Sequence, residues 1–120
     1  MPTISFEEFQ KVELRVVKVL EAERVVGSEK LLKLKVDMGT QAATAENANP
    51  EKEIRQIIAG IGKKYEPETL LGKEIVIVAN LEPRMLMGLE SQGMVLAAHD
   101  DSGPILIQPE TEVAPGEKLG

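Results

Sequence analysis

Ser91 is the residue whose surroundings most resemble those of a catalytic nucleophile. It lies between Gly88 and Gly93 in the stretch GLESQGMVLAA. A hydrolase nucleophile elbow requires the order Gly-x-Ser-x-Gly on a turn that leads from a strand into a helix. Here the spacing differs, and the apolar residues that follow predict a strand. The Ser-Gln-Gly turn therefore needs another role.

His99 is the only histidine and hence the only candidate imidazole base, and Asp100 and Asp101 follow it directly. Adjacent residues in an extended chain point to opposite faces, so the three side chains cannot form a relay without special geometry, and they make a weak metal site. Phosphate-binding and dinucleotide-binding glycine motifs are absent from the sequence. We therefore expect a solvated hairpin end here, and no enzyme, cofactor or metal site.

Several lysines could instead bind the phosphates of a nucleic acid. The net charge is −6, but residues 85–120 carry six acidic residues and a single basic one, Lys118, so a basic face could exist on the first two thirds of the chain. The natural candidates for phosphate contacts are Lys30, Lys33, Lys35, Lys63 and Lys64. On charge alone, these five lysines are better explained as solubilising side chains.

The aromatic content limits how such a surface could work. Phe6, Phe9 and Tyr65 are the only aromatic residues, so there is no series of rings on which successive bases could stack. Binding to nucleic acid would depend mainly on shape, phosphate contacts and a few polar or methionine contacts.

The elements that must position these residues are mostly strands. Val12, Leu14 and Val16 alternate with polar residues, and the slip after Val17 predicts a long, bent first strand with a bulge. Before it, Ser5 and Glu8 have the spacing of a capping box. Leu32, Leu34, Val36 and Met38 predict a second strand whose other face, with Lys33, Lys35 and Asp37, is wet. Further strands are expected at 54–62, 73–81, 93–98 and 105–107, an exposed hairpin loop at 40–50, and a helical turn at 65–72.

This order predicts an all-β fold. Five main strands, with a short helix between the third and the fourth, match a five-stranded Greek-key barrel of the oligonucleotide-binding (OB) type. A small sandwich or an SH3-like barrel is the alternative. We expect one domain over 1–120, with the barrel at about 11–98 and a C-terminal extension at about 99–120.

The sequence also suggests a compartment. There are no cysteines, which permits a reducing environment and excludes disulfides. Neither a membrane span nor a signal peptide is recognisable. We therefore expect a cytoplasmic protein.

Four separated blocks carry a family resemblance: FEEFQKVELRVVKVLEAERV, SEKLLKLKVDMG, IIAGIGKKYEPETLLGKEIVIVANL and GLESQGMVLAA. In order and spacing they resemble the tRNA-binding domain that occurs as a free-standing homodimeric protein and as the C-terminal extension of many methionyl-tRNA synthetases. The resemblance implies an OB barrel and a C-terminal dimerisation extension that pairs with its copy. It also implies that tRNA is recognised by shape, at the outer corner of the L.

The resemblance also implies site residues. The Ser-Gln-Gly-Met turn lies at the rim of the binding face in the family, although Met94 could equally be a core residue. For Met85, Leu86, Met87 and Leu89 we expect burial at the junction between barrel and tail or in a dimer seam. Two features depart from the family: the 40–50 loop is longer, and Lys64-Tyr65 stands where many relatives have paired tyrosines. The expected tRNA contacts are Lys30, Lys33, Asn80, Arg84, Ser91, Gln92 and Met94.

Three functions follow as hypotheses. The first is a non-catalytic tRNA-binding module, free-standing or attached to a methionyl-tRNA synthetase, that raises the local tRNA concentration. The second is a dimeric, export-related peptide-binding chaperone of the same fold, which would use the methionines of the 85–94 region. The third is a dimerisation appendage that binds neither ligand.

Overall fold

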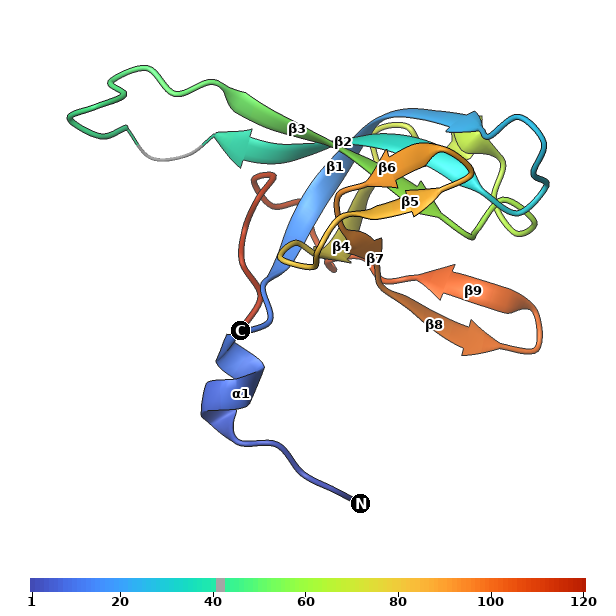
Figure 1. Cartoon of the computed structure of the whole chain (residues 1–120), viewed down its shortest axis with the longest axis horizontal. Coiled ribbons are helices and arrows are strands. Elements are labelled where there is room, and N and C mark those ends of the chain that lie inside the picture. Colours follow the sequence, from blue (N-terminus) through green and yellow to red (C-terminus); the bar gives the residue numbers. More distant parts are fainter. Residues whose placement is uncertain (41–42) are drawn as a thin grey trace.

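The architecture is a strongly curled antiparallel sheet with two small hairpins attached (Figure 1). A computed structural model describes residues 1–40 and 43–120. Its five-stranded sheet has the order β3-β2-β1-β4-β7, and β5-β6 and β8-β9 form separate two-stranded sheets. The elements are α1 (Phe6–Gln10), β1 (Leu14–Arg24), β2 (Leu32–Thr40), β3 (Lys52–Ala59), the 3-10 helix η1 (Pro67–Leu70), β4 (Glu74–Val78), β5 (Arg84–Leu86), β6 (Leu89–Ser91), β7 (Met94–Val95), β8 (Ala97–Asp100) and β9 (Gly103–Leu106).

Strand β1 makes the sheet curl. Its first half, Leu14 to Lys18, pairs with β4, and its second half pairs with β2. The register between β1 and β2 shifts between Val19 and Glu21, which is the predicted bulge. A bulge bends the strand and increases its twist, so one strand can belong to both sides of a barrel.

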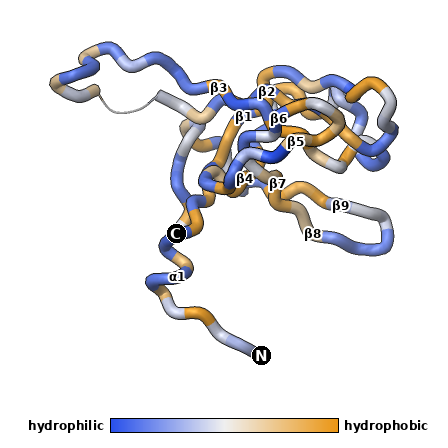
Figure 2. Tube along the Cα trace, in the orientation of Figure 1, coloured by the Kyte–Doolittle hydropathy of each residue, from blue (hydrophilic) through white to orange (hydrophobic). Residues whose placement is uncertain are grey.

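The core confirms most of the predicted alternation. Leu32, Leu34 and Val36 are buried, and so is all of β4. Asp37 was expected on the wet face but is buried. Its carboxylate accepts a hydrogen bond from the Gly39 N–H at 2.7 Å and lies 3.6 Å from Lys52 Nζ, so local partners compensate for the burial. Figure 2 shows the hydrophobic residues concentrated around β1 and β4.

The predicted fifth strand at 93–98 is wrong in its extent. Only β7 pairs with β4, and after Leu96 the chain leaves the sheet. Residues 97–100 pair instead with β9, in a hairpin that turns at Asp101 and Ser102. Because β8 pairs with β9, its backbone N–H and C=O groups have hydrogen-bond partners outside the five-stranded sheet, which therefore ends at β7.

The β5-β6 hairpin is an element that the sequence did not predict. It contains Met85, Leu86, Met87 and Leu89, for which burial was expected. Met85 and Met87 are exposed, while Leu86 and Leu89 are half-buried. The prediction that the two methionines are buried between barrel and tail of one chain was therefore wrong. This segment folds back on itself as a hairpin and does not line that junction.

The C-terminal segment covers the edge of β1 that β2 leaves open. The N–H of Val16 donates to the Glu117 carbonyl, and the N–H of Leu119 donates to the Leu14 carbonyl, both at 2.9 Å. Gly39 and Gly116 let the tail approach β2 closely, because a Cβ on either residue would collide with the backbone beside the other. Within one chain, the tail thus adds an isolated β-bridge, between Arg15 and Lys118, to the edge of the barrel.

The N-terminus behaves differently. As predicted, Ser5 caps α1 and forms a capping box with Glu8. The helix projects from the sheet (Figure 1), and none of its residues is buried. Ile4, Phe6 and Phe9 expose apolar surface. In the described residues, no helix is long and apolar enough to cross a membrane.

Candidate nucleic-acid interface

The Ser91-Gln92-Gly93 turn closes the barrel. The Ser91 hydroxyl accepts a hydrogen bond from the Ile58 N–H at 2.9 Å and donates one to the Gly93 carbonyl at 3.0 Å. Gln92 exchanges hydrogen bonds with Gln56 of β3: its side-chain oxygen accepts from the Gln56 N–H at 2.9 Å, and its own N–H donates to the Gln56 carbonyl at 2.8 Å. These bonds join β3 to the turn without a regular strand ladder.

This geometry defines what Ser91 can do. The side chain is buried, with 4% of the residue exposed, and both hydrogen-bonding directions of its hydroxyl are used inside the protein. The Ile58 N–H and the Gly93 carbonyl are its hydrogen-bond partners. As a candidate tRNA contact, Ser91 lies beneath the surface and positions its neighbours.

Arg84 and Met94 lie at the surface beside this turn. Together with Ser91 and Leu81 they line a small pocket of about 50 Å³. Both Arg84 and Met94 are exposed, so Met94 is placed at the surface and not in the core. The structure therefore brings three of the expected contacts together at the rim of the barrel.

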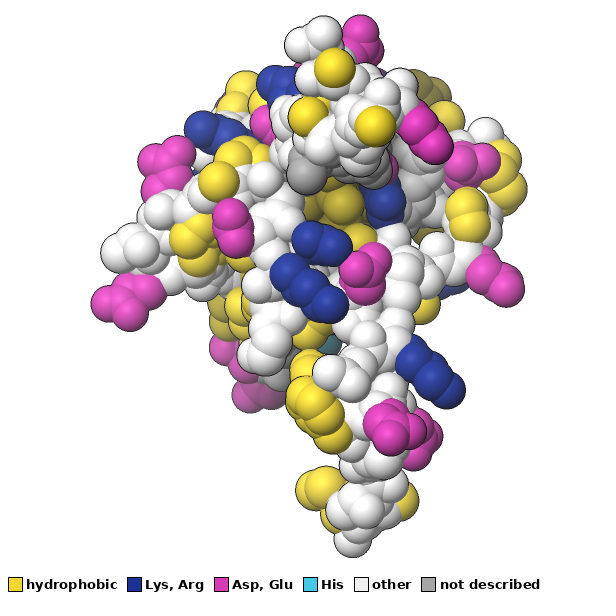
Figure 3. Space-filling view, turned by 90° about the vertical axis from the view of Figure 1, so that its left-hand side faces the viewer, with side chains coloured by type: hydrophobic (Ala, Val, Ile, Leu, Met, Phe, Trp, Pro, Cys, Tyr) yellow, Lys and Arg dark blue, Asp and Glu magenta, His cyan; other side chains and the backbone are white. Residues whose placement is uncertain are grey.

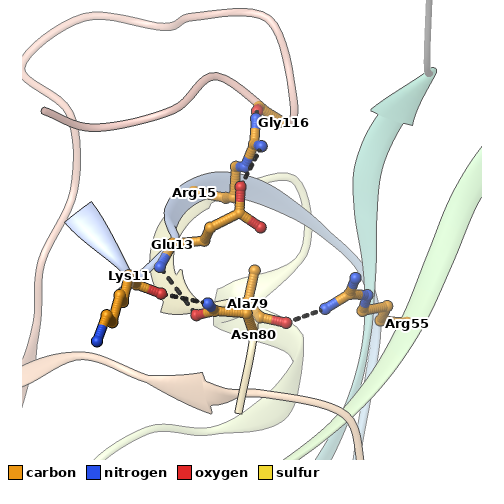
Figure 4. A network of polar contacts seen from close by, with 7 residues as sticks. All are labelled: Lys11, Glu13, Arg15, Arg55, Ala79, Asn80 and Gly116. Carbon is orange, nitrogen blue, oxygen red and sulfur yellow. Dashed lines mark hydrogen bonds and ion pairs between the residues drawn. The ribbon is translucent and has the colours of Figure 1, made fainter. Parts of the chain in front are cut away.

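Asn80 is held in a different network (Figure 4). Its side-chain nitrogen donates to the Lys11 carbonyl, and its side-chain oxygen accepts from the Glu13 N–H at 2.8 Å. These bonds fasten the chain before β1 to the end of β4. Asn80 remains exposed, but the amide already has two backbone partners, so its evident role is to position this corner.

Lys33 lies on the outer face of β2. Its Nζ is 2.6 Å from Glu23 Oε1, and its side chain is half-buried. Next along this face, Lys35 donates to the Gln56 side chain at 2.9 Å. Because an ammonium group has three N–H donors, one carboxylate partner leaves Lys33 able to contact a phosphate.

Lys30 belongs to a second group of cations. It lines a groove of about 410 Å³ with Lys63 and Lys64, whose opposite wall is the tip of the β8-β9 hairpin. Lys64 donates to the Ser102 hydroxyl at 2.5 Å. The five lysines proposed as phosphate partners are thus divided between the face of β2 and this groove.

The His99 region is a hairpin end, as expected. His99 pairs with Pro104, and the Asp100 carboxylate accepts hydrogen bonds from Ser102. These bonds, with a smaller contribution from the Lys64 charge, lower the pKa of Asp100 below its ordinary value of 3.8. Within residues 1–40 and 43–120, no cluster of three His, Cys, Asp or Glu side chains could hold a metal ion.

The sequence interpretation overlooked Arg15 and Arg55. Both line a pocket of about 440 Å³ at the open end of the barrel, between the tail and β2. Each guanidinium is paired with a carboxylate two residues away, Glu13 or Glu53. Arg15 also donates to the Gly116 carbonyl and Arg55 to the Ala79 carbonyl (Figure 4). Figure 3 shows basic and acidic side chains next to one another on this side of the molecule. Arg55 lies opposite Val36 in the pairing of β2 with β3, a register that local sequence patterns do not reveal.

Comparison with known proteins identifies the class to which this fold and surface belong. Residues 14–118 match the family described as "Putative tRNA binding domain". The match covers most of the chain, and the chain therefore belongs to this tRNA-binding domain family.

The similar proteins include the following two groups. Methionine–tRNA ligases of Chloroherpeton thalassium and Thermotoga maritima are 50% and 49% identical, over 98% and 97% of this chain. The chain spans only 15% and 16% of their length. The structure of a MetRS-related protein from Pyrococcus horikoshii has a TM-score of 0.83 and 34% identity, with both chains fully covered. The chaperone CsaA from Bacillus anthracis has a TM-score of 0.78 and 28% identity, over 99% of this chain and 100% of the other.

Proposed function

We propose that this chain is a non-catalytic module that binds tRNA by its shape. Membership of the tRNA-binding domain family over residues 14–118 is the observation that carries the proposal. The surface supports it, because Arg84 and Met94 are exposed beside the closing turn and Lys33 lies on the adjoining sheet. Cations on a rigid β-barrel suit contacts to phosphates at fixed spacing.

In this proposal, Lys30, Lys33 and Arg84 contact phosphates, and Met94 contacts a base or a sugar. Ser91, Gln92 and Asn80 act one step further back, because their side chains are bonded to the backbone. Their hydrogen bonds hold the rim and the start of β1 in place. This division assigns a positioning role to three residues that the family resemblance presented as contacts.

The biological role that we propose is to raise the tRNA concentration near a synthetase. Long relatives of this chain are methionine–tRNA ligases, so a methionyl-tRNA synthetase catalytic domain is the proposed partner, in the same polypeptide or as a separate chain. A weak grip on tRNA makes its second contact, with the catalytic domain, intramolecular. We expect this activity in the cytoplasm, where tRNA is aminoacylated.

We also propose that the chain forms a homodimer. Exposed apolar side chains on α1 and on the C-terminal hairpin support this proposal, notably Phe6, Phe9 and Ile105. A five-residue helix cannot be stable by itself in water, so a second copy that covers these surfaces would stabilise it. Sedimentation equilibrium should give twice the mass of one chain, and a Phe6→Ser/Phe9→Ser variant should shift the equilibrium towards monomers.

A salt titration of tRNA binding is the first test of the proposed function. Labelled unfractionated tRNA is titrated with the protein between low and moderate salt, with duplex RNA and single-stranded RNA of similar length as competitors. We expect affinity that falls steeply with salt, because phosphate contacts release counterions, and a preference for folded tRNA. No binding at low salt would reject the proposal.

A peptide-binding chaperone is the second candidate, because the similar structures include CsaA proteins from two organisms. The exposed apolar residues of the β5-β6 hairpin provide a surface for it. Apolar contacts persist when ionic contacts are screened. Binding of an unfolded polypeptide that survives high salt, without a preference for folded tRNA, would favour this candidate.

A further inference from the structure

The turn of the β5-β6 hairpin has a residue that its backbone does not favour. Met87 and Gly88 are its two central residues, with φ of 52° and 79°. Two-residue hairpin turns with positive φ at both positions are most often made by Asn-Gly, Asp-Gly or Gly-Gly. Among the described residues, Met87 is the only non-glycine with positive φ. A long side chain at this position therefore calls for an explanation beyond the turn itself.

The Met87 side chain reaches across to the loop between β1 and β2. Its terminal methyl group is 3.4 Å from the position that a Cβ on Gly27 would occupy. Between hairpin and loop lies a groove of about 270 Å³, whose apolar lining is Val25, Val26, Met87 and Leu89. The two elements are far apart in sequence, so the groove exists only because the hairpin folds over the sheet.

Burial does not explain the two outer walls of this groove. Met87 is 58% exposed and Val26 is 95% exposed, whereas Val25 at its floor is buried. Neither of these two side chains is part of the hydrophobic core, and both keep apolar surface in contact with water. The groove thus has the form of a site that another molecule completes.

The charged residues around the groove indicate what that molecule is. Glu23, Arg24 and Lys33 form its polar border. Arg24 is held by Glu66 and by the Gly62 carbonyl, each at 2.9 Å. Lys33 Nζ lies 2.6 Å from Glu23 Oε1, which leaves two of its three N–H donors for a phosphate. An apolar groove with an ammonium group at its border suits a flat base joined to a phosphate.

The aromatic residues of the chain are located elsewhere. Phe6 and Phe9 are on α1, which projects from the sheet, and the Tyr65 hydroxyl accepts a hydrogen bond from the Leu106 N–H. A base on the outer face of the sheet therefore has no ring of this chain to stack on. The polarisable thioether of Met87 is the best substitute on this face, because methionine makes favourable contacts with aromatic systems.

We infer that the groove between Val26 and Met87 seats one unpaired nucleobase of a bound tRNA, while Lys33 holds the adjoining phosphate. This inference rests on the proposed tRNA binding and deepens it. Shape and phosphates select the folded tRNA, and the groove adds a single contact to a base that is not paired. Duplex RNA, which offers no such base, lacks this contact.

Met87→Gly is the central variant for the test. Glycine adopts positive φ without strain, so the hairpin and the protein should keep their thermal stability while the wall of the groove is lost. Full-length variant and wild type are titrated with labelled tRNA and with blunt duplex RNA of similar length at one salt concentration. Loss of one base contact should weaken tRNA binding about tenfold, with duplex binding and the salt dependence of tRNA binding unchanged.

Two further variants and a control make the result specific. Val26→Ser removes the opposite wall and should weaken tRNA binding in the same way. Lys33→Ala should weaken binding to both RNAs, because it removes a phosphate contact. Leu71→Ala serves as the control, since Leu71 is 51% exposed and does not line the groove, and it should bind both RNAs as the wild type does.

A modified RNA tests the base directly. Abasic nucleotides are introduced one at a time at the unpaired positions of the tRNA outer corner. One of these should weaken wild-type binding and have no further effect on Met87→Gly, because both changes remove the same contact. Independent, additive losses at every position would overturn the inference.

The remaining outcomes separate the inference from the proposed function. Wild-type preference for tRNA that Met87→Gly and Val26→Ser both retain would overturn the groove and leave tRNA binding intact. Wild type that does not bind tRNA would overturn both. Loss of unfolded-peptide binding in Met87→Gly, with tRNA binding unchanged, would assign the groove to an apolar side chain of a polypeptide and overturn the nucleobase.

Discussion

The Ser91 hydroxyl lies 2.9 Å from the backbone nitrogen of Ile58 and replaces a strand-to-strand hydrogen bond at the closing seam of the barrel. In the part of the chain that the structure describes, β3 and β6 belong to different sheets. The Ser91 side chain thus supplies the hydrogen-bond acceptor that the backbone of a neighbouring strand would normally supply to Ile58. It does so where β6 ends and the chain turns towards β7.

Ser91→Ala should destabilise the protein. The substitution leaves the buried Ile58 N–H without an acceptor, and such a loss costs about 1–3 kcal/mol. The free energy of unfolding is measured by urea denaturation. Ser102→Ala is the matched control, because Ser102 is exposed at a hairpin tip, and its loss should change stability by less than about 0.5 kcal/mol. A fully stable Ser91→Ala protein that no longer binds tRNA would show instead that the hydroxyl faces the RNA.

Gly116→Ala should loosen the C-terminal tail. A Cβ at this position would collide with the Met38 carbonyl, and φ is +94°. We expect the free energy of unfolding to fall by about 3 kcal/mol, because overpacking and an unfavourable backbone conformation both contribute. Gly72→Ala isolates the second contribution, because Gly72 has φ of +80° and nothing within 4 Å of its Cβ position. The free energy of unfolding of Gly72→Ala, measured by urea denaturation, should fall by about 1 kcal/mol. Equal losses in the two variants would argue against the close contact between tail and β2.

Lys33→Ala should weaken the binding of all tRNAs alike. A lysine that contacts a phosphate contributes to affinity without regard to sequence, and its removal reduces the salt slope by about one. Lys73→Ala, which removes an exposed lysine between η1 and β4, controls for net charge. The measurement is a salt titration with several purified tRNAs. A loss confined to one tRNA would contradict recognition by shape.

Asp100 should titrate below its ordinary pKa of 3.8, because the hydrogen bonds from Ser102 favour the carboxylate. A depressed pKa in the folded state means that any contribution to stability is present above the unfolded pKa and is lost as the pH falls through the folded one. NMR titration of the Asp100 carboxyl carbon measures the value. Ser102→Ala should raise it, and Lys64→Ala should raise it less; an unchanged pKa in Ser102→Ala would contradict this hairpin geometry.

Much of the barrel follows from local patterns in the sequence. Leu32, Leu34 and Val36 alternate as a half-buried strand must, and the slip after Val17 indicates the bulge that bends β1. The continuous apolar run from Ile75 to Ala79 indicates a strand buried on both faces. These features depend on neighbours in sequence, and the structure confirms them.

The errors have non-local causes. The turn of the β5-β6 hairpin lacks the usual Asn-Gly signal, because Met87 occupies the first central position. The fifth strand was too long because the apolar residues 95–98 do not reveal that Ala97 and Ala98 pair with β9. In both cases the pairing between strands in the folded protein determined the structure, and local sequence patterns did not indicate that pairing.

The roles of the polar candidates were also beyond the reach of the sequence. Ser91 and Gln92 lie more than 30 residues from their partners in β3, and Asn80 is 67 residues from Glu13. A serine, glutamine or asparagine in a turn has the same local pattern whether it faces a ligand or holds the backbone. Only the folded arrangement distinguishes the two.

The hydrogen bond between the Leu119 N–H and the Leu14 carbonyl has a practical consequence for protein engineering. It brings the beginning and the end of the barrel to the same point of its surface (Figure 1). A unit whose ends meet can be circularly permuted, or grafted into a surface loop of a host protein, without a long linker to bridge it. The exposed tip of the β8-β9 hairpin, which lies outside the five-stranded sheet, offers a place for the new ends.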